Sequence, residues 1–487
     1  MTMSALANVV ADPASTLQGL WLLAGMPPEA LDQVRLTGSD PVLPSSFAVG
    51  TAAQSTVAAA ALAACELGHM RGMDRQLVSV DMLHAALECV GWFSINGRAP
   101  PLFDALSGLY QCLDGWVRLH AVFEHHRYGA LRLLGLSMDT TERWQVERAI
   151  SGWRALELEA VAARAGLVLT ALRSFDEWDA SDQGKAISAQ PLFSIEKIAD
   201  APPLELPPLP DNGTDVLPLH GIRVLDVTRI LAGPVAGRTL AGYGADVMLV
   251  NAPHLRNIEA IAETSRGKLS THLDLRNRMG KTGFKELLTG SHVMIQGYRP
   301  GGLEAFGFGP GKASQVRPGI VYVTLSAYGR DGPWAERRGF DSLVQTAMGF
   351  NLAEGQAASP SVGEPSNLAV PRALPMQILD HATGFLIALC SSAAIARQQR
   401  EGGSWHVNVS LAQTGHWLRS LGRIANGFAV PVSPPDPYLE ASDSGFGKLM
   451  SISHSATLSK TPAKWNRSSM PPGTHAPIWP ADQVEQQ

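Results

Sequence analysis

The alternation of short apolar runs and helical segments between residues 222 and 326 most constrains what this chain can fold into. Residues 222–227 read IRVLDV, a buried-strand pattern. A Gly233-Pro234 turn, a helix through about residue 242 and a second strand at 246–250 follow. Strand, turn, helix and strand within about thirty residues make a βαβ unit, which requires a parallel sheet. Further strands are predicted at 270–275, 292–295 and 320–326, with a helix at 280–288. We therefore expect a doubly wound, Rossmann-like α/β domain.

A proline-rich segment, PLELPPLPDNGTDVLP at residues 203–218, precedes this domain and is interpreted as an extended linker. Residues 1–202 are predicted to be helical, with a smaller α+β domain. Their main features are helices at 52–70 and 141–164, a short strand at 77–80 and a hairpin at 110–119. Residues 219–420 are the Rossmann-like region. Residues 421–487 form a C-terminal extension with strand signal only near 449–452, and its last dozen residues are expected to be loose.

Composition excludes several classes of protein. Lys and Arg number 39 against 44 Asp and Glu, a net charge of −5, so no basic field exists to bind nucleic acid. The four cysteines form no C-x-x-C pair and the fourteen histidines no spaced cluster, so neither a disulfide framework nor a metal site is predicted. No apolar run reaches membrane-spanning length, since residues 382–396 are interrupted by Ser391 and Ser392. The N-terminus shows no secretory signal, and we expect a cytoplasmic protein.

Two loops that follow strands are candidates for ligand binding. In LAGPVAGR (231–238), glycine after a strand and a helix N-terminus favour an anion. The spacing is not G-x-G-x-x-G and the second strand ends in Asn251, which disfavours nicotinamide or flavin; Gly233 then simply makes a tight turn. The loop that begins at Gln296 offers the Gly297 amide, the Tyr298 ring and the Arg299 cation, or is an ordinary Gly/Pro loop.

Two single residues carry further chemistry. Lys268, just before a predicted strand, would suit a phosphate, although an isolated lysine is most often a solvated surface charge. Asp380 begins an apolar helix, where a carboxylate acts either as an N-cap or as a nucleophile or base desolvated by an apolar wall.

These segments carry a resemblance to a known family. GIRVLDVTRILAGPVAGRTLAGYGADVMLV, RGKLSTHLDLRN, VMIQGYRPGGLEAFGFG and RPGIVYVTLSAYGRDGPWAERRGFDSLVQTAMG follow one another in this chain. The helix with Asp380-x-x-x-Gly384 comes next and leads into ARQQREGGSWHVNVSLAQ. Together they resemble family III CoA-transferases of the CaiB/BaiF type, across roughly residues 219–418.

The resemblance implies transfer of CoA from an acyl-CoA thioester to a free carboxylic acid, with no tightly bound cofactor. Asp380 would attack the thioester carbonyl and pass through an aspartyl anhydride and an aspartyl-CoA intermediate. Matching positions imply contacts with CoA from Leu231, Ala232, Gly233, Lys268, Gln296, Gly297, Tyr298, Arg299 and Tyr328.

Two other functions remain open. The family includes 2-methylacyl-CoA racemases, whose histidine falls at Phe340 in the triplet Gly339-Phe340-Asp341; phenylalanine cannot move a proton, which favours the transferase. The family's acid at the end of the second strand is Asn251 here, a departure that also fits a degenerate, non-catalytic CoA-binding protein.

The halves of the family occur in reversed order, because residues 1–202 resemble its C-terminal half. The central helix–strand motif should then occur twice. Pairing Thr51 with Asp380 and continuing in step brings Val78 and Val80 onto Val407 and Val409. A threonine hydroxyl cannot form the anhydride, so the first copy is predicted to be a structural remnant. Family members form interlocked dimers, and both a self-closed chain and a homodimer fit the sequence.

Overall fold

The computed structural model describes residues 10–210, 216–359 and 370–480. Its largest sheet has seven strands in the order β10-β9-β8-β11-β12-β13-β7. Neighbours are parallel except β7, which runs antiparallel to β13 at one edge. The order reverses between β8 and β11, which confirms the doubly wound parallel sheet. The strands are β7 (Phe193–Ala199), β8 (Arg223–Val227), β9 (Asp246–Asn251), β10 (Leu269–His272), β11 (Val293–Gln296), β12 (Val321–Ser326) and β13 (Ser404–Ser410).

Both faces of this sheet are covered. Consecutive side chains of its buried strands are apolar and point to opposite sides, so each face packs against a core. Val293 and Ile295 face a core shared with α9 (Ala232–Gly242) and α15 (Ile378–Glu401). Met294 faces a second core shared with α11 (Arg278–Thr289) and α12 (Pro310–Val316). The remaining helices of this region are α10 (Ile261–Thr264), α13 (Asp341–Met348), α14 (Phe350–Ala358) and α16 (Leu411–Ser420).

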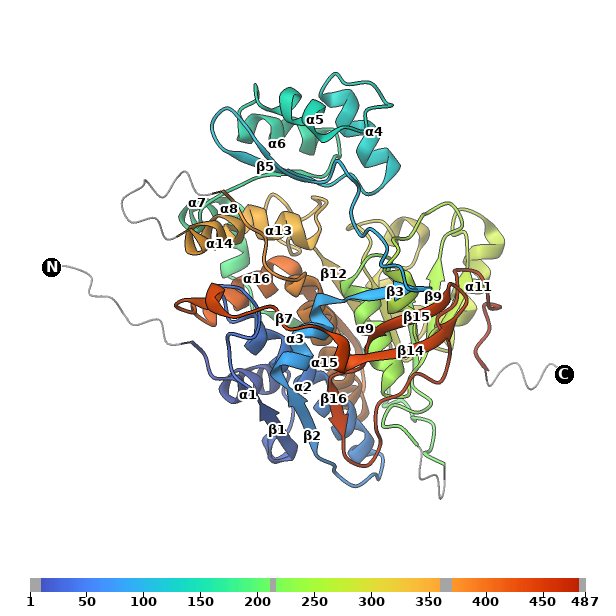
Figure 1. Cartoon of the computed structure of the whole chain (residues 1–487). Helices are drawn as coiled ribbons and strands as arrows, with labels where there is room; N and C mark the ends of the chain where they lie inside the picture. Colours follow the sequence, from blue (N-terminus) through green and yellow to red (C-terminus); the bar gives the residue numbers. More distant parts are fainter. Residues whose placement is uncertain (1–9, 211–215, 360–369, 481–487) are drawn as a thin grey trace.

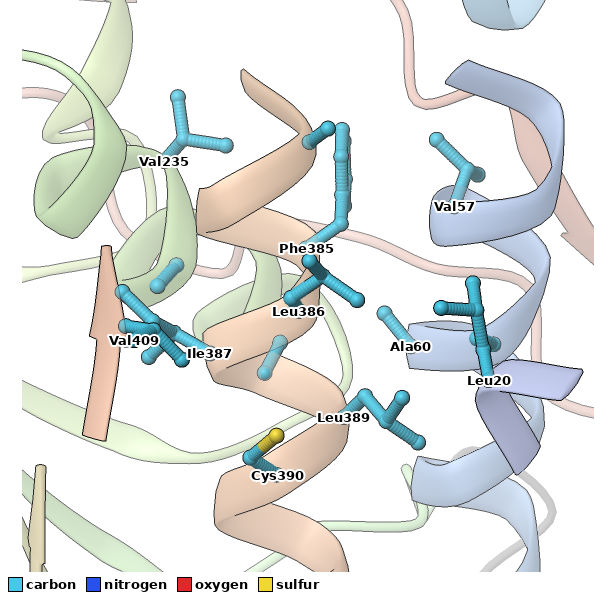
Figure 2. Close-up of a cluster of buried hydrophobic side chains, with 14 of the residues drawn as sticks. Leu20, Val57, Ala60, Val235, Phe385, Leu386, Ile387, Leu389, Cys390 and Val409 are labelled. Atoms are coloured by element: carbon cyan, nitrogen blue, oxygen red, sulfur yellow. The ribbon is translucent and has the colours of Figure 1, made fainter. Parts of the chain in front are cut away.

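The helix α15 is the central element of the core. It lies between α9, which contributes Val235, and α2 (Val49–Met70), which contributes Val57 and Ala60 (Figure 2). It is longer than the apolar segment predicted from the sequence, and by length and composition one window of it would span a membrane. All of that window is buried inside the protein, as is typical of a core helix.

The repeat expected from the sequence is present in the backbone. In the register that pairs Thr51 with Asp380, α2 begins where α15 begins and β2 (Val78–Asp81) matches the end of β13. β1 (Val34–Thr37) is parallel to β2 as β12 is to β13. β16 (Ala456–Leu458) is antiparallel to β2 as β7 is to β13. The two copies pack against each other through α2 and α15.

Residues 1–202 divide between the body of the molecule and a small domain. α1 (Pro13–Leu23), α2 and α3 (Met82–Val90) pack in the body of the molecule, and β7 joins the main sheet. A small domain with a core of its own stands apart at the top of Figure 1. It contains β4 (Gly108–Gln111), β5 (Trp116–Leu119), β6 (Leu169–Ala171), α4 (Glu124–Leu133), α5 (Arg143–Ile150) and α6 (Ala155–Arg164). α7 (Phe175–Ala180) and α8 (Asp182–Ser188) return the chain to the body.

Two sequence predictions about local structure were wrong. Residues 141–164 form two helices, α5 and α6, because the chain turns at Ser151 and Gly152. The C-terminal extension has more strand than the signal near 449–452 predicted: β15 (Gly447–Ile452) pairs with β14 (Leu439–Ser444) and with β3 (Phe93–Ile95). Within the last dozen residues, Trp479 is buried and its Nε1 donates to the carbonyl of Leu287, while residues 481–487 lie outside the described part.

Candidate active site

Loops at the carboxyl ends of β8, β11 and β12 line a cavity of about 400 Å³, called the large cavity below. It opens where the strand order reverses between β8 and β11, the place where doubly wound sheets bind ligands. Asp380 is one of its lining residues, although it comes from α15 and not from a loop. Predicted site residues that line this cavity are Leu231, Ala232, Gly233, Gly297, Tyr298 and Arg299.

Three predicted CoA contacts, Lys268, Gln296 and Tyr328, are not among the residues that line the large cavity. Lys268 is fully buried, and its Nζ lies 2.7 Å from Oδ2 of Asp226 and 2.8 Å from the carbonyl oxygen of Pro234. Burial lowers the pKa of Lys268, while the carboxylate of Asp226 acts in the opposite direction. The structure places this lysine in a buried ion pair rather than on a ligand surface.

This ion pair supports the loop that leads into the cavity. Oδ1 of Asp226 accepts from the backbone N–H of Thr228 at 3.1 Å, while Oδ2 binds Lys268. A methyl group at Gly237 would lie 2.4 Å from Oδ2 of Asp226, so only glycine leaves room for the pair beneath α9. Lys268 therefore supports the loop at 228–231 through Asp226.

Gln296 and Tyr328 also shape the walls of the site. Oε1 of Gln296 accepts from the backbone N–H of Tyr298 at 2.9 Å, and this bond holds the turn after β11. Tyr328 is 1% exposed and packs edge-on against Trp334, with ring centroids 5.0 Å apart. Neither side chain is placed to touch a ligand in the large cavity.

Asp380 lies in the first turn of α15, which begins at Ile378 and has Gln377 as its N-cap. The N-cap alternative for Asp380 was therefore wrong. The side chain accepts instead from the backbone N–H of Ala232, the first residue of α9, and is almost fully buried. Burial, and then the negative charge of Asp341, raise the pKa of Asp380 well above its usual value. The amide at the start of α9 is the group that favours the ionised form.

Asp341 is a functional residue that the sequence reasoning missed, although it directly follows Phe340. Its Oδ2 accepts from the backbone N–H of Asp380 at 3.0 Å, so this carboxyl caps the start of α15. Burial raises the pKa of Asp341 to about 6, against the effect of the Asp380 amide and of the Gln345 side chain. Two buried carboxyls this close hold a proton at pH values where a surface aspartate is ionised. Asp341 is thus a positioning residue that also sets the charge of Asp380.

Positive charge gathers on the large cavity. Arg229, Arg337 and Arg338 line it in addition to the predicted Arg299. Arg337 pairs with Glu159 at 3.3 Å, whereas no carboxylate within ion-pair distance is found for the other three among the described residues. Nη1 of Arg338 lies 2.8 Å from Nε2 of His126. The adjacent arginines in AERRGFD could have signalled this cluster from the sequence.

A second cavity of about 60 Å³, called the small cavity below, meets the large one at Asp380. The two share Phe123, Ile230, Leu231, Phe340 and Asp380. Phe340 stacks on His120 of the small domain, with ring centroids 4.1 Å apart. The other residues that line the small cavity are Val90, Gly91, Phe93, Leu102, Phe103, Val122, Ile258, Ala260, Glu263, Gln377 and His381.

The site therefore joins two chemically different spaces at one carboxyl group. The large cavity presents cations and loop amides, which suit a phosphorylated ligand. The small cavity is mostly apolar. Asp380 stands where both meet, with the start of α9 as its hydrogen-bond donor.

Comparison with known proteins identifies relatives of this chain. Residues 219–426 match the family model "CoA-transferase family III". This segment belongs to CoA-transferase family III. The chain is 31% identical over 337 residues to an acyl-CoA transferase of Gibberella moniliformis, which is 66% of this chain and 58% of that one. It is 30% identical over 238 residues to a probable fatty acyl-CoA transferase of Mycobacterium tuberculosis, 45% of this chain and 58% of that one.

Among solved structures, a CaiB/BaiF family protein from Brucella suis shares 26% identity over 48% of this chain and 65% of its own, with a TM-score of 0.37. The chain thus spans little more than half the length of the two CoA-transferases named above.

The first copy of the helix–strand motif, at α2, has a carboxylate cap like that of α15 but no aspartate at the position of Asp380. Oδ1 of Asp40 accepts from the N–H of Gly50, and Oδ2 accepts from the N–H of Thr51 at 2.7 Å. Asp40 thus caps the start of α2 as Asp341 caps the start of α15. Thr51 stands where α15 has Asp380, and its hydroxyl donates to Oδ2 of Asp40 at 2.8 Å.

Proposed function

We propose that this protein transfers coenzyme A from an acyl-CoA thioester to a free carboxylic acid, with Asp380 as the covalent nucleophile. The observation that carries the proposal is the position of the Asp380 carboxyl at the junction of a cationic and an apolar cavity. A thioester whose nucleotide end lies among the arginines and whose acyl chain lies in the small cavity would present its carbonyl carbon to Asp380.

The nucleotide end of CoA is anionic and needs cations or free amides. Arg229, Arg299 and Arg338 supply the cations, and the turn at 231–233 supplies amides at the start of α9. Tyr298, on the same wall, offers an aromatic face. CoA is a substrate here and not a resident cofactor.

The reaction then proceeds in two balanced halves. An oxygen of Asp380 attacks the thioester carbon, the C–S bond breaks, and an anhydride and CoA thiolate form. The thiolate attacks the Asp380 carbonyl of the anhydride, which releases the donor acid and leaves CoA on Asp380 as a thioester. The acceptor carboxylate attacks that thioester, expels the thiolate and forms a new anhydride. Attack of the thiolate on the acceptor carbonyl gives the new acyl-CoA and restores Asp380.

The surroundings of Asp380 serve this chemistry. A carboxylate is a weak nucleophile when hydrated, and burial strips its water. The N–H of Ala232 holds the carboxyl in place, while the hydrogen bond that the backbone N–H of Asp380 donates to Asp341 fixes the backbone that carries it. Exclusion of water also protects the anhydride from hydrolysis.

Trapping of the intermediate tests the proposal. Purified protein is incubated with an acyl-CoA and then with hydroxylamine, and the peptide containing Asp380 is analysed by mass spectrometry. We expect an aspartyl hydroxamate at Asp380 in the wild type and none in Asp380→Asn. Asp443→Asn, on exposed strand β14, is the matched control and should retain the adduct.

Exchange of an isotopically labelled acid into acyl-CoA is the second readout. Undiminished exchange in Asp380→Asn would refute the nucleophile. CoA binding without exchange would indicate a non-catalytic binding protein, and exchange of the α-proton with solvent, without transfer, would indicate a racemase.

A further inference from the structure

The small cavity contains no lysine or arginine among its lining residues, in contrast to the large cavity. Its titratable side chains are Asp380, Glu263, His120 and His381. Any acyl group that enters it therefore meets carboxylates and imidazoles, but no fixed cation.

Both imidazoles are neutral at physiological pH. Burial and, to a lesser extent, the nearby guanidinium of Arg118 together lower the pKa of His120 to about 3. Burial lowers the pKa of His381 to about 4, with Arg238 acting in the same direction. Neither ring supplies a positive charge to a ligand.

Glu263 is paired with two arginines, and each of them is also paired with another carboxylate. Its Oε1 is bonded to both Arg238 and Arg266, which are buried. Arg238 also pairs with Glu88 at 2.9 Å, and Arg266 also pairs with Glu440. Three carboxylates thus share two guanidiniums, so this cluster offers no unbalanced positive charge to a second anion.

The size of the small cavity limits the acyl chain as well. A cavity needs roughly 10–15 Å³ to hold one water-sized group, so about 60 Å³ holds roughly four to six non-hydrogen atoms. The walls around this space are mainly Leu, Ile, Val and Phe side chains.

We infer that the acyl group transferred by this protein is short and uncharged and derives from an aliphatic monocarboxylic acid. Its chain beyond the carbonyl has roughly four to six non-hydrogen atoms, which fill the small cavity. The inference rests on the proposed function, because it assumes that Asp380 receives the acyl carbon. A dicarboxylic acyl group would bury its second carboxylate beside Glu263 without a partner, which is strongly unfavourable.

Donors of matched length test this inference. Pentanoyl-CoA and succinyl-CoA have chains of similar size, but one ends in a methyl group and the other in a carboxylate; dodecanoyl-CoA exceeds the cavity. The hydroxylamine adduct at Asp380 and kcat/KM are measured for each. We expect pentanoyl-CoA to exceed succinyl-CoA in kcat/KM by about 100-fold or more, since the carboxylate is left unpaired, and to exceed dodecanoyl-CoA as well.

The outcomes separate the two proposals. An adduct with none of the donors would contradict the proposed function. An adduct with succinyl-CoA formed as fast as with pentanoyl-CoA would overturn the inference about charge, and equal use of dodecanoyl-CoA would overturn the inference about size.

A substitution at the rim of the small cavity provides a second test. Leu102 lines it and is 39% exposed, so Leu102→Arg adds a cation with little risk to folding. We expect the preference for pentanoyl-CoA over succinyl-CoA to fall by about 10-fold or more. Leu113→Arg, at an exposed position of the small domain outside both cavities, is the matched control and should leave the preference unchanged. An unchanged preference in Leu102→Arg would refute the assignment of the small cavity to the acyl chain.

Discussion

Replacement of Gly384 by alanine would place a methyl group 2.7 Å from the carbonyl oxygen of Ala232 and 2.7 Å from Cγ1 of Val235. Carbon contacts of this kind are normal from about 3.4 Å, so α15 and α9 must separate by about 0.7 Å. The helix α9 begins at Ala232, whose N–H holds the Asp380 carboxyl. A steric change one turn along α15 is therefore transmitted to the Asp380 carboxyl.

The magnitude follows from two opposing effects on stability and one on activity. Overpacking costs about 1–3 kcal/mol, and alanine in place of a mid-helix glycine returns about 1 kcal/mol, so we expect a net loss of about 0–2 kcal/mol in unfolding free energy. Displacement of a catalytic group by about 1 Å reduces rates by about 100-fold. Gly384→Ala should thus lower kcat/KM far more than its stability loss would suggest.

The assay is acid exchange into acyl-CoA, measured beside urea unfolding. Gly290→Ala is the matched control, because its methyl group would lie 2.9 Å from Cδ1 of Trp479, away from the cavities. We expect both variants to be mildly destabilised and Gly384→Ala alone to lose activity. Full activity in Gly384→Ala at a measurable stability loss would show that the contact between α9 and α15 does not control Asp380.

Three further predictions concern buried charges. Asp341→Asn removes the negative charge that raises the pKa of Asp380, so the pH midpoint of adduct formation should move to lower pH; an unchanged midpoint would contradict the coupling. In urea unfolding, Asp380→Asn should be more stable than the wild type, by a margin that grows as pH rises above about 4. The reason is that a raised aspartate pKa favours the folded wild type at low pH, and this advantage is lost as pH rises. Lys268→Met should cost about 3–5 kcal/mol, since it leaves the Asp226 carboxylate buried without its cation, and Asp226→Asn in the same chain should restore much of this. A stable Lys268→Met variant with a raised KM for CoA would instead support a ligand contact.

The sequence predicted those parts of the site that depend on local chain order. Glycine turns directly after buried strands located Gly233 and Gly297, because parallel strands bring their carboxyl ends to one edge of the sheet. Asp380 stood out at the start of an apolar helix, and the resemblance implied its role as nucleophile. The structure adds the donor at Ala232, which lies far away in sequence.

The parts that were missed depend on tertiary contacts. A buried lysine and a solvated one look alike in sequence, and the partner of Lys268 lies on another strand of the sheet, at Asp226. The small cavity combines His120 near the small domain, Phe93 in β3 and Phe340 before α13, which no local pattern brings together. The prediction of one helix at 141–164 followed its apolar spacing past Gly152, where glycine's low helix propensity permits a break.

The two copies of the helix–strand motif separate what the fold requires from what the chemistry requires. Both α2 and α15 begin under a carboxylate cap, Asp40 or Asp341, so the cap belongs to the helix start and does not depend on a nucleophile. A second carboxylate next to such a cap carries an electrostatic cost, seen in the raised pKa of Asp380. Thr51 avoids that cost, because its hydroxyl donates to the cap instead of repelling it. Packing alone therefore gives no reason for an aspartate at this place in the helix. Of the two copies, the one with the aspartate is the one where α9 and two cavities meet, and this is the strongest physical reason to assign it the reaction.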